Sequence, residues 1–188
     1  MSDNSGIKAV SSKDVFKMIF ESKKVFRAHD DKCIEVKEHS ENVCKICKDI
    51  ALQLKTGGIE VDKKLLKKAA YLHDIGKANY DEDAHPYMSL VYMYNIFDCS
   101  GGKKEEYAWK LGQIIIAHKG IFCPPVCVAK EAAILRMADK IDRFGRKDDA
   151  SKKYKRNLKK IESHFECCDA AFFENLKKAC NTVKEQYS

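Results

Sequence analysis

The 188-residue sequence has few residues that interrupt regular structure, with only three prolines and nine glycines. It also lacks any apolar run that approaches the roughly 20 residues needed to cross a bilayer as a helix. Its first residues, MSDNSGIKAVSSKD, lack the apolar core of a signal peptide. These absences argue against long flexible linkers, a membrane anchor and secretion, so we expect a single cytoplasmic domain.

Strand-forming patterns are scarce, and residues that favour helices dominate. Lys, Glu, Ala and Leu are abundant, and apolar residues make up 45% and charged residues 34% of the chain. Apolar residues recur every three or four positions, a spacing that predicts amphipathic helices. The sequence therefore predicts an all-α fold, a bundle of about six core helices followed by a C-terminal helical hairpin. The core helices are expected over about 11–28, 32–55, 62–72, 84–99, 103–119 and 128–144, and the hairpin over about 150–188.

The formal net charge is +7, which favours anionic partners such as phosphorylated small molecules or nucleic acid. Much of this charge is lysine along the expected solvent faces of helices, where it needs no partner. Nucleic-acid binding has little support, because the basic residues are not interleaved with aromatics expected to be exposed and form no recognised binding motif.

Nine cysteines are present, and a reducing compartment would keep them as free thiols. Cys44 and Cys47, together with Cys123 and Cys127, allow one alternative, a four-thiolate zinc site. The first pair falls in the middle of a predicted helix and the second pair brackets two prolines, spacings that are unusual for zinc. Small buried side chains are the simpler interpretation.

Histidines and aspartates fall on the apolar faces of several predicted helices. His39 lies between Val36 and Val43 at helical spacing, and His118 follows Ile115 by three residues. A single histidine on an apolar face is usually a hydrogen-bonded core residue. Several imidazoles and carboxylates buried together without a counter-charge are costly, and a bound metal ion removes that cost. The candidate ligands are His39, His73, Asp74, His85, His118 and Asp139.

The segment YLHDIGK, residues 71–77, places a histidine and an aspartate side by side at the expected end of a helix. Neighbours within a helix point about 100° apart, but at a helix end both side chains can approach one site. His73 would bind one metal ion, and Asp74, which has two oxygens, would bridge to a second. Gly76 is expected to end the helix and let the backbone turn away.

These motifs resemble the H…HD…D pattern of the HD-domain metal-dependent phosphohydrolases. The segments that carry the resemblance are EHSENV around His39, LHDIGK around the His73-Asp74 pair, and RMADKID around Asp139. The similarity spans about residues 36–145, and the all-helical prediction agrees with the family fold. Because order and local sequence agree together, the match is more specific than the dipeptide alone.

The resemblance implies roles for individual residues. His85 and His118 match two further histidines, which hold a second metal ion or, in one-metal members, contact substrate phosphate. Lys77 matches a lysine that contacts phosphate, although an exposed helix-end lysine is the alternative interpretation. The metal ligands implied are His39, His73, Asp74 and Asp139, and Asp74 and Lys77 would be catalytic.

Two further residues are candidate substrate-binding residues. Lys119 directly follows His118 and would add positive charge near a phosphate. Asp142 lies about one helical turn after Asp139. There it would orient a metal ligand or a positive substrate-binding group, or lie on the surface as an ordinary acid.

The implied function is hydrolysis of a phosphomonoester or phosphodiester bond, in a nucleotide, by a metal-activated water. One or two divalent ions are expected, and nitrogen and oxygen ligands favour iron or manganese, with zinc, cobalt, nickel and magnesium as alternatives. A symmetrical dinucleoside-tetraphosphate hydrolase is another possibility. Those enzymes usually have a longer insertion than the eleven residues between His73 and His85. The cyclic-di-GMP branch carries HHE and DG-x-GYP where this chain has AHKGIFCPP, so that activity is not expected.

A non-catalytic metal- or nucleotide-binding module is the alternative of another class. We expect one domain over residues 1–188, with an HD core at about 32–146 and a C-terminal extension at about 150–188. The expected partner is a phosphorylated small molecule and not a membrane, while a homo-oligomer stays open. The hairpin would cover the active site, form a dimer contact or cap the core.

Overall fold

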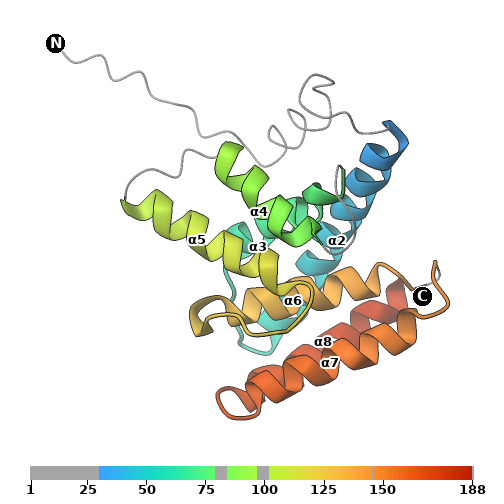
Figure 1. Ribbon diagram of the computed structural model, residues 1–188. Helices are drawn as coiled ribbons and strands as arrows, with labels where there is room; N and C mark the ends of the chain where they lie inside the picture. Colours follow the sequence, from blue (N-terminus) through green and yellow to red (C-terminus); the bar gives the residue numbers. More distant parts are fainter. Residues whose placement is uncertain (1–29, 79–83, 97–101, 145, 188) are drawn as a thin grey trace.

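The computed structural model describes residues 30–78, 84–96, 102–144 and 146–187. In these residues the chain is helical and contains no strand, which confirms the predicted all-α fold (Figure 1). The expected helix over about 11–28 lies outside the described residues. The α-helices are α2 (Asp30–Thr56), α3 (Lys63–Leu72), α4 (His85–Ile96), α5 (Gly102–Ala117), α6 (Ala129–Ile141), α7 (Ala150–Phe165) and α8 (Ala170–Gln186), and two short 3-10 helices, η1 and η2, span Ile75–Ala78 and Val126–Val128.

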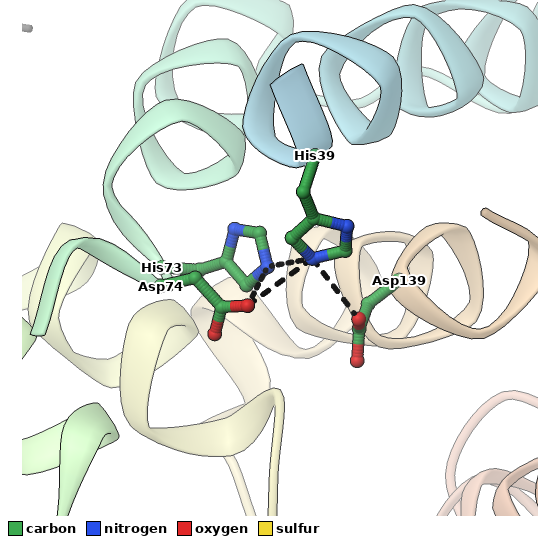
Figure 2. A group of neighbouring side chains, drawn as sticks. All are labelled: His39, His73, Asp74 and Asp139. Atoms are coloured by element: carbon green, nitrogen blue, oxygen red, sulfur yellow. Dashed lines mark hydrogen bonds and ion pairs between the residues drawn. The ribbon is translucent and has the colours of Figure 1, made fainter. Parts of the chain in front are cut away.

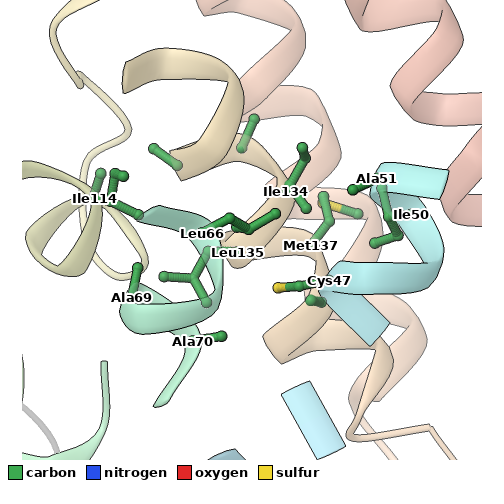
Figure 3. Packing of buried hydrophobic residues seen from close by; sticks show 14 of the residues in the cluster. Cys47, Ile50, Ala51, Leu66, Ala69, Ala70, Ile114, Ile134, Leu135 and Met137 are labelled. Carbon is green, nitrogen blue, oxygen red and sulfur yellow. The ribbon is translucent and has the colours of Figure 1, made fainter. Parts of the chain in front are cut away.

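Helix α6 occupies the centre of the bundle. All of its residues except Lys130 are buried, and it contacts α2, α3, α5, α7 and α8. Figure 3 shows how aliphatic side chains from α2, α3, α5 and α6 meet in one cluster, in which Ile50, Leu66, Ile114 and Leu135 are fully covered. Burial of each such side chain contributes about 1.5–3 kcal/mol. None of the described helices is long and apolar enough to cross a membrane.

The start of α3 follows from its capping residue. The Asp62 side chain accepts hydrogen bonds from the backbone N–H groups of Lys64 and Leu65 at 3.0 and 2.9 Å. These bonds satisfy two donors that the first helical turn leaves unpaired, as expected of an N-cap aspartate. The backbone N–H of Asp62 donates to Glu131 Oε1 of α6 at 2.7 Å, so the same residue fixes α3 against the central helix.

Gly76 is required for a reason other than the expected one. The sequence suggested a backbone turning away after the helix, but Gly76 lies within η1 without a positive φ, so that explanation is wrong. Instead, α4 approaches very closely, and a Cβ atom at Gly76 would lie 2.3 Å from the carbonyl oxygen of His85 and 2.8 Å from the backbone nitrogen of Ser89. The Ser89 hydroxyl accepts from Gly76 N–H and donates to the carbonyl oxygen of His73, both at 2.9 Å. Together these contacts hold the HD segment against the start of α4.

The C-terminal hairpin is ordered and forms part of the core. Helices α7 and α8 lie beside α6 (Figure 1), and the aromatic side chains of Phe172 and Phe173 are buried in the same cluster as those of the central helices. The fully buried Arg136 of α6 donates to Asn157 Oδ1 of α7 at 2.7 Å. It also donates to the carbonyl oxygens of Ala117 and Gly120, at 2.9 and 2.7 Å. Arg136 therefore joins the hairpin to the end of α5.

Candidate metal centre

Five segments of the chain converge on one cluster of histidine and aspartate side chains. Figure 2 shows side chains from α2, from the end of α3 and from α6 pointing toward one another. All of the converging residues are buried except His39 of α2, whose side chain is 13% exposed. The cluster contains His39 of α2, His73 and Asp74 after α3, His85 at the start of α4, His118 after α5 and Asp139 of α6.

The cluster consists of two groups that share Asp74. Donor atoms of His39, His73, Asp74 and Asp139 lie within 4.8 Å of one another, as do those of Asp74, His85 and His118. Asp74 Oδ2 lies 3.1 Å from His39 Nε2 and 3.5 Å from His73 Nε2. Asp74 Oδ1 lies 3.0 Å from His85 Nε2 and 3.4 Å from His118 Nε2. One carboxylate thus presents one oxygen to each group.

Hydrogen bonds to the far side of three rings fix how the imidazoles face the cluster. The Nδ1 atoms of His73 and His118 lie 2.9 and 2.5 Å from the backbone carbonyl oxygen three residues earlier. His39 Nδ1 lies 2.7 Å from Asp142 Oδ2. Because these oxygens only accept hydrogen bonds, each Nδ1 carries a hydrogen, and the Nε2 atom presents a lone pair whenever the ring is neutral. This is the arrangement that partners behind a metal-binding histidine usually impose.

The resulting cluster contains more acceptors than donors. The Nε2 atoms of His39 and His73 face each other at 3.3 Å, and those of His85 and His118 at 3.1 Å. Asp74 Oδ1 and His85 Nδ1 are buried without a hydrogen-bond partner, although two imidazoles lie close to that oxygen. A buried unpaired carboxylate oxygen is costly, and a divalent cation would accept its lone pair together with those of the facing Nε2 atoms. The residues therefore fit a metal ion, and their nitrogen and oxygen donors suit a transition metal better than magnesium.

Charge states in the cluster also suit metal binding. Burial lowers the pKa of His73 to about 3 and lowers the pKa of His118, although Asp74 opposes both shifts. Burial acts to raise the pKa of the Asp74 carboxyl, but the surrounding imidazoles outweigh it and hold the pKa well below its usual range. For Asp139, Lys140, His39 and Arg143 likewise outweigh burial. Neutral imidazoles and ionised carboxylates are the forms that bind metal ions.

We expect the metal-free chain to lose stability as the pH falls from 6.5 to 5. The unfolded state binds protons at His73 and His118 near pH 6.5, while the folded state resists protonation because both pKa values are lowered. Burial acts to lower the pKa of His39, but Asp139 and Asp74 outweigh it and raise the pKa, so the folded state takes up this proton before the unfolded state does. Its contribution to the slope has the opposite sign and fades as the pH falls below 6.5, where both states become protonated. The free energy of unfolding should decrease by up to about 1.4 kcal/mol per pH unit for each imidazole that stays neutral.

Urea denaturation in EDTA across this pH range measures the slope. His73→Asn should make the slope shallower, because it removes one of the two imidazoles. A wild-type slope of zero or of opposite sign would contradict the neutral, buried state of these rings.

The three further site candidates fall in different places. Lys77 and Lys119 line a pocket of about 360 Å³ beside the cluster, and the Lys77 ammonium pairs with Asp74 Oδ2. Asp142 is not among the lining residues; its carboxylate contacts His39 Nδ1 and Arg146. Of the roles considered for Asp142, this position matches the orientation of a metal ligand.

Several residues that line the pocket were not predicted from the sequence. The pocket is also lined by Arg136, Lys140, Arg143, Lys153, Arg156, Asn157 and Lys160. The residues from α7 recur at positions i, i+3, i+4 and i+7, the spacing of one helix face. That periodicity was visible in the sequence, but lysines are so frequent along α7 that it did not distinguish the pocket face from a solvated one.

The four-thiolate zinc alternative is not formed. Within the described part of the chain, the side-chain groups able to hold a metal ion contain no cysteine. Cys47 is buried in the core and Cys44 is partly buried, whereas Cys123 and Cys127 are exposed, and all four are free thiols.

Comparison with known proteins places the cluster in a family context. The family model described as HD domain matches residues 36–144, which include all six cluster residues. No match was found among curated proteins or among solved structures. The matched segment covers more than half of the sequence. On this match, and with the helical bundle and the paired histidine–aspartate groups in place, the chain belongs to the HD-domain family.

Proposed function

We propose that this protein is a metal-dependent phosphohydrolase that cleaves a phosphomonoester or phosphodiester bond in a nucleotide. The observation that carries the proposal is the position of Asp74, whose two oxygens face two separate groups of imidazole nitrogens. Such a shared carboxylate is suited to hold two cations near each other, as in many enzymes that hydrolyse phosphate esters. The basic pocket beside it supplies the electrostatic environment that an anionic substrate needs.

The first group, with His39, His73, Asp74 and Asp139, would hold one divalent ion, and Asp74 with His85 and His118 would hold a second. When bound, such ions activate water as a nucleophile and offset the negative charge of phosphoryl oxygens. We favour iron or manganese, because the donor set combines imidazole with carboxylate and contains no thiolate.

The chain's own residues position and neutralise the substrate. Lys77 and Lys119 line the pocket next to the cluster, where their ammonium groups would contact phosphoryl oxygens. Lys77 also pairs with Asp74, so it holds that carboxylate in place. Asp142 accepts the Nδ1 hydrogen of His39 and keeps the Nε2 atom directed at the cluster.

Metal removal provides the direct test. We expect protein purified without chelator to contain a transition metal by elemental analysis and to release phosphate from at least one compound of a defined panel. The panel is p-nitrophenyl phosphate, bis(p-nitrophenyl) phosphate, nucleoside monophosphates, cyclic nucleotides and diadenosine tetraphosphate. EDTA treatment should abolish turnover, and Mn²⁺ or Fe²⁺ should restore it, because the cluster supplies no nucleophile of its own without the ion.

The outcomes separate the alternatives. Metal bound at stoichiometric level with no turnover across the panel would favour a non-catalytic binding module. Turnover that persists unchanged after complete metal removal would contradict the proposed function.

A further inference from the structure

Two groups among the residues that line the pocket beside the metal centre differ in origin. One group belongs to the centre itself, since His85, His118 and Asp139 line the pocket. Another group is the α7 face described above, with Lys153 and Lys160 near its two ends. Helix α7 (Ala150–Phe165) begins after residue 144, where the HD-domain match ends, so this wall is an addition to the family core.

Helix α7 contacts the turn after α5 through the carbonyl group of Gly120, in addition to the bond between Arg136 and Asn157. Lys160 Nζ donates to the carbonyl oxygen of Gly120 at 3.0 Å, and Arg136 donates to the same oxygen at 2.7 Å. Gly120 follows His118 by two residues. The α7 face is therefore held next to the turn that carries a metal-centre histidine, by contacts that include a fully buried arginine.

Positive charge is concentrated around this pocket, which eight cationic side chains and one carboxylate line; two of the cations, Lys77 and Lys153, pair with carboxylates outside the lining. The carboxylate, Asp139, already pairs with Lys140 and lies 3.4 Å from Arg143. Burial lowers the pKa of Lys160, and the neighbouring charges of Arg136, Arg156 and Lys140 lower it further. The cationic lining residues are Lys77, Lys119, Arg136, Lys140, Arg143, Lys153, Arg156 and Lys160.

We propose that α7 provides a second anion subsite, formed by Lys153, Arg156 and Lys160, so that the substrate carries at least two phosphate groups. One phosphate would lie at the metal centre and another against α7. This inference rests on the proposed function for the identity of the first subsite. Lys153 also pairs with Asp149 at the start of α7, at 2.6 Å, so its ammonium is already held on this helix.

A small oligophosphate fits the pocket better than a nucleic acid does. The pocket encloses about 360 Å³, within the range of small-ligand sites. Its charges surround one hollow, whereas binding along a nucleic-acid strand requires a groove that follows the backbone over several nucleotides. Multivalent anions bind most tightly where several cations converge on one concave space.

The test compares how the wild type and three variants bind phosphate-containing probes. Isothermal titration of the full-length chain, with its metal content measured before and after, uses inorganic phosphate and inorganic tripolyphosphate, and any cleavage is followed by released phosphate. The pocket variant combines Lys153→Gln, Arg156→Gln and Lys160→Gln. The control variant combines Lys152→Gln, Lys155→Gln and Lys159→Gln, three exposed residues of the same helix that do not line the pocket.

We expect wild type to bind tripolyphosphate more tightly than phosphate. The pocket variant should bind tripolyphosphate at least about 10-fold more weakly than the control variant does, the combined effect expected of three partly exposed charges. Its affinity for phosphate should stay within about 3-fold of the control. Arg156→Gln alone should weaken tripolyphosphate binding by about 3-fold. Because this single change breaks no hydrogen bond of the described structure, it tests the subsite even if the triple variant misfolds.

Equal weakening by the two triple variants would show a general charge effect and overturn the inference. The same holds if wild type shows no preference for tripolyphosphate, or binds a single-stranded RNA 12-mer more tightly than it binds tripolyphosphate. A chain that binds tripolyphosphate through α7 but hydrolyses nothing would contradict the proposed function and leave the subsite standing. A chain that hydrolyses its substrate, but whose pocket variant binds tripolyphosphate as tightly as the control variant does, would contradict the subsite alone.

Discussion

Replacing Asp74 with alanine is expected to abolish both metal binding and turnover while the helical content is retained. Asp74 is shared by the two groups of candidate ligands, so its loss removes a donor from both at once. Losing even a residue that only supports a metal ligand costs 10- to 100-fold in affinity or activity. Removal of the shared ligand should therefore reduce metal affinity and kcat/KM by at least about 100-fold.

Elemental analysis after dialysis and kinetic assay with saturating Mn²⁺ measure the two effects, and circular dichroism reports the helices. Asp148→Ala, at an exposed aspartate outside the cluster, is the matched control and should resemble wild type. Asp74→Asn keeps the shape of the side chain but removes its charge, and it should bind metal more weakly than wild type. Full metal content and full activity in Asp74→Ala would end the assignment of this cluster as the metal centre.

Gly76→Ala is expected to damage both stability and the metal centre, although residue 76 touches no ligand atom. The new Cβ would lie 2.3 Å from the carbonyl oxygen of His85 and 2.8 Å from the backbone nitrogen of Ser89. Both are backbone atoms, so α4 must move away as a unit. Such overpacking costs typically 1–3 kcal/mol, and at a contact this short the upper part of that range, about 2–3 kcal/mol, is expected.

Movement of α4 also carries His85 away from Asp74 Oδ1, from which its Nε2 atom now lies 3.0 Å. The metal content per chain should fall, with the group of Asp74, His85 and His118 losing its ion first. Gly112→Ala is the control, because its Cβ would meet the flexible end of the Leu90 side chain, which can rotate away. Unchanged urea denaturation and unchanged metal content in Gly76→Ala would contradict this account of the close approach.

The parts of the fold that local chemistry determines were predictable from the sequence. Asp62 caps α3 as expected, because capping depends on residues within one helical turn. His118 and Asp139 were predicted to face inward from helical periodicity, and both are buried in the cluster. The order of the HD motifs then indicated which inward-facing polar residues meet.

What escaped prediction depends on contacts between distant segments. The need for glycine at position 76 comes from the approach of α4, and no local pattern around the His73-Asp74 pair predicts where another helix will lie. The pocket wall of α7 likewise depends on the bond between Lys160 and Gly120, which are forty residues apart. The burial of Arg136 likewise could not be predicted, because its three acceptors come from separate segments of the chain.

The burial of the hairpin also limits where the protein can be truncated. Phe172, Leu176 and Val183 of α8 are almost completely covered and belong to the same cluster as the residues of α2 and α6. A protein fragment that ended at the boundary of the family match would expose a large hydrophobic surface of those central helices to solvent. Recombinant expression of that fragment should therefore yield inclusion bodies, so the two last helices belong in any minimal version of this enzyme candidate.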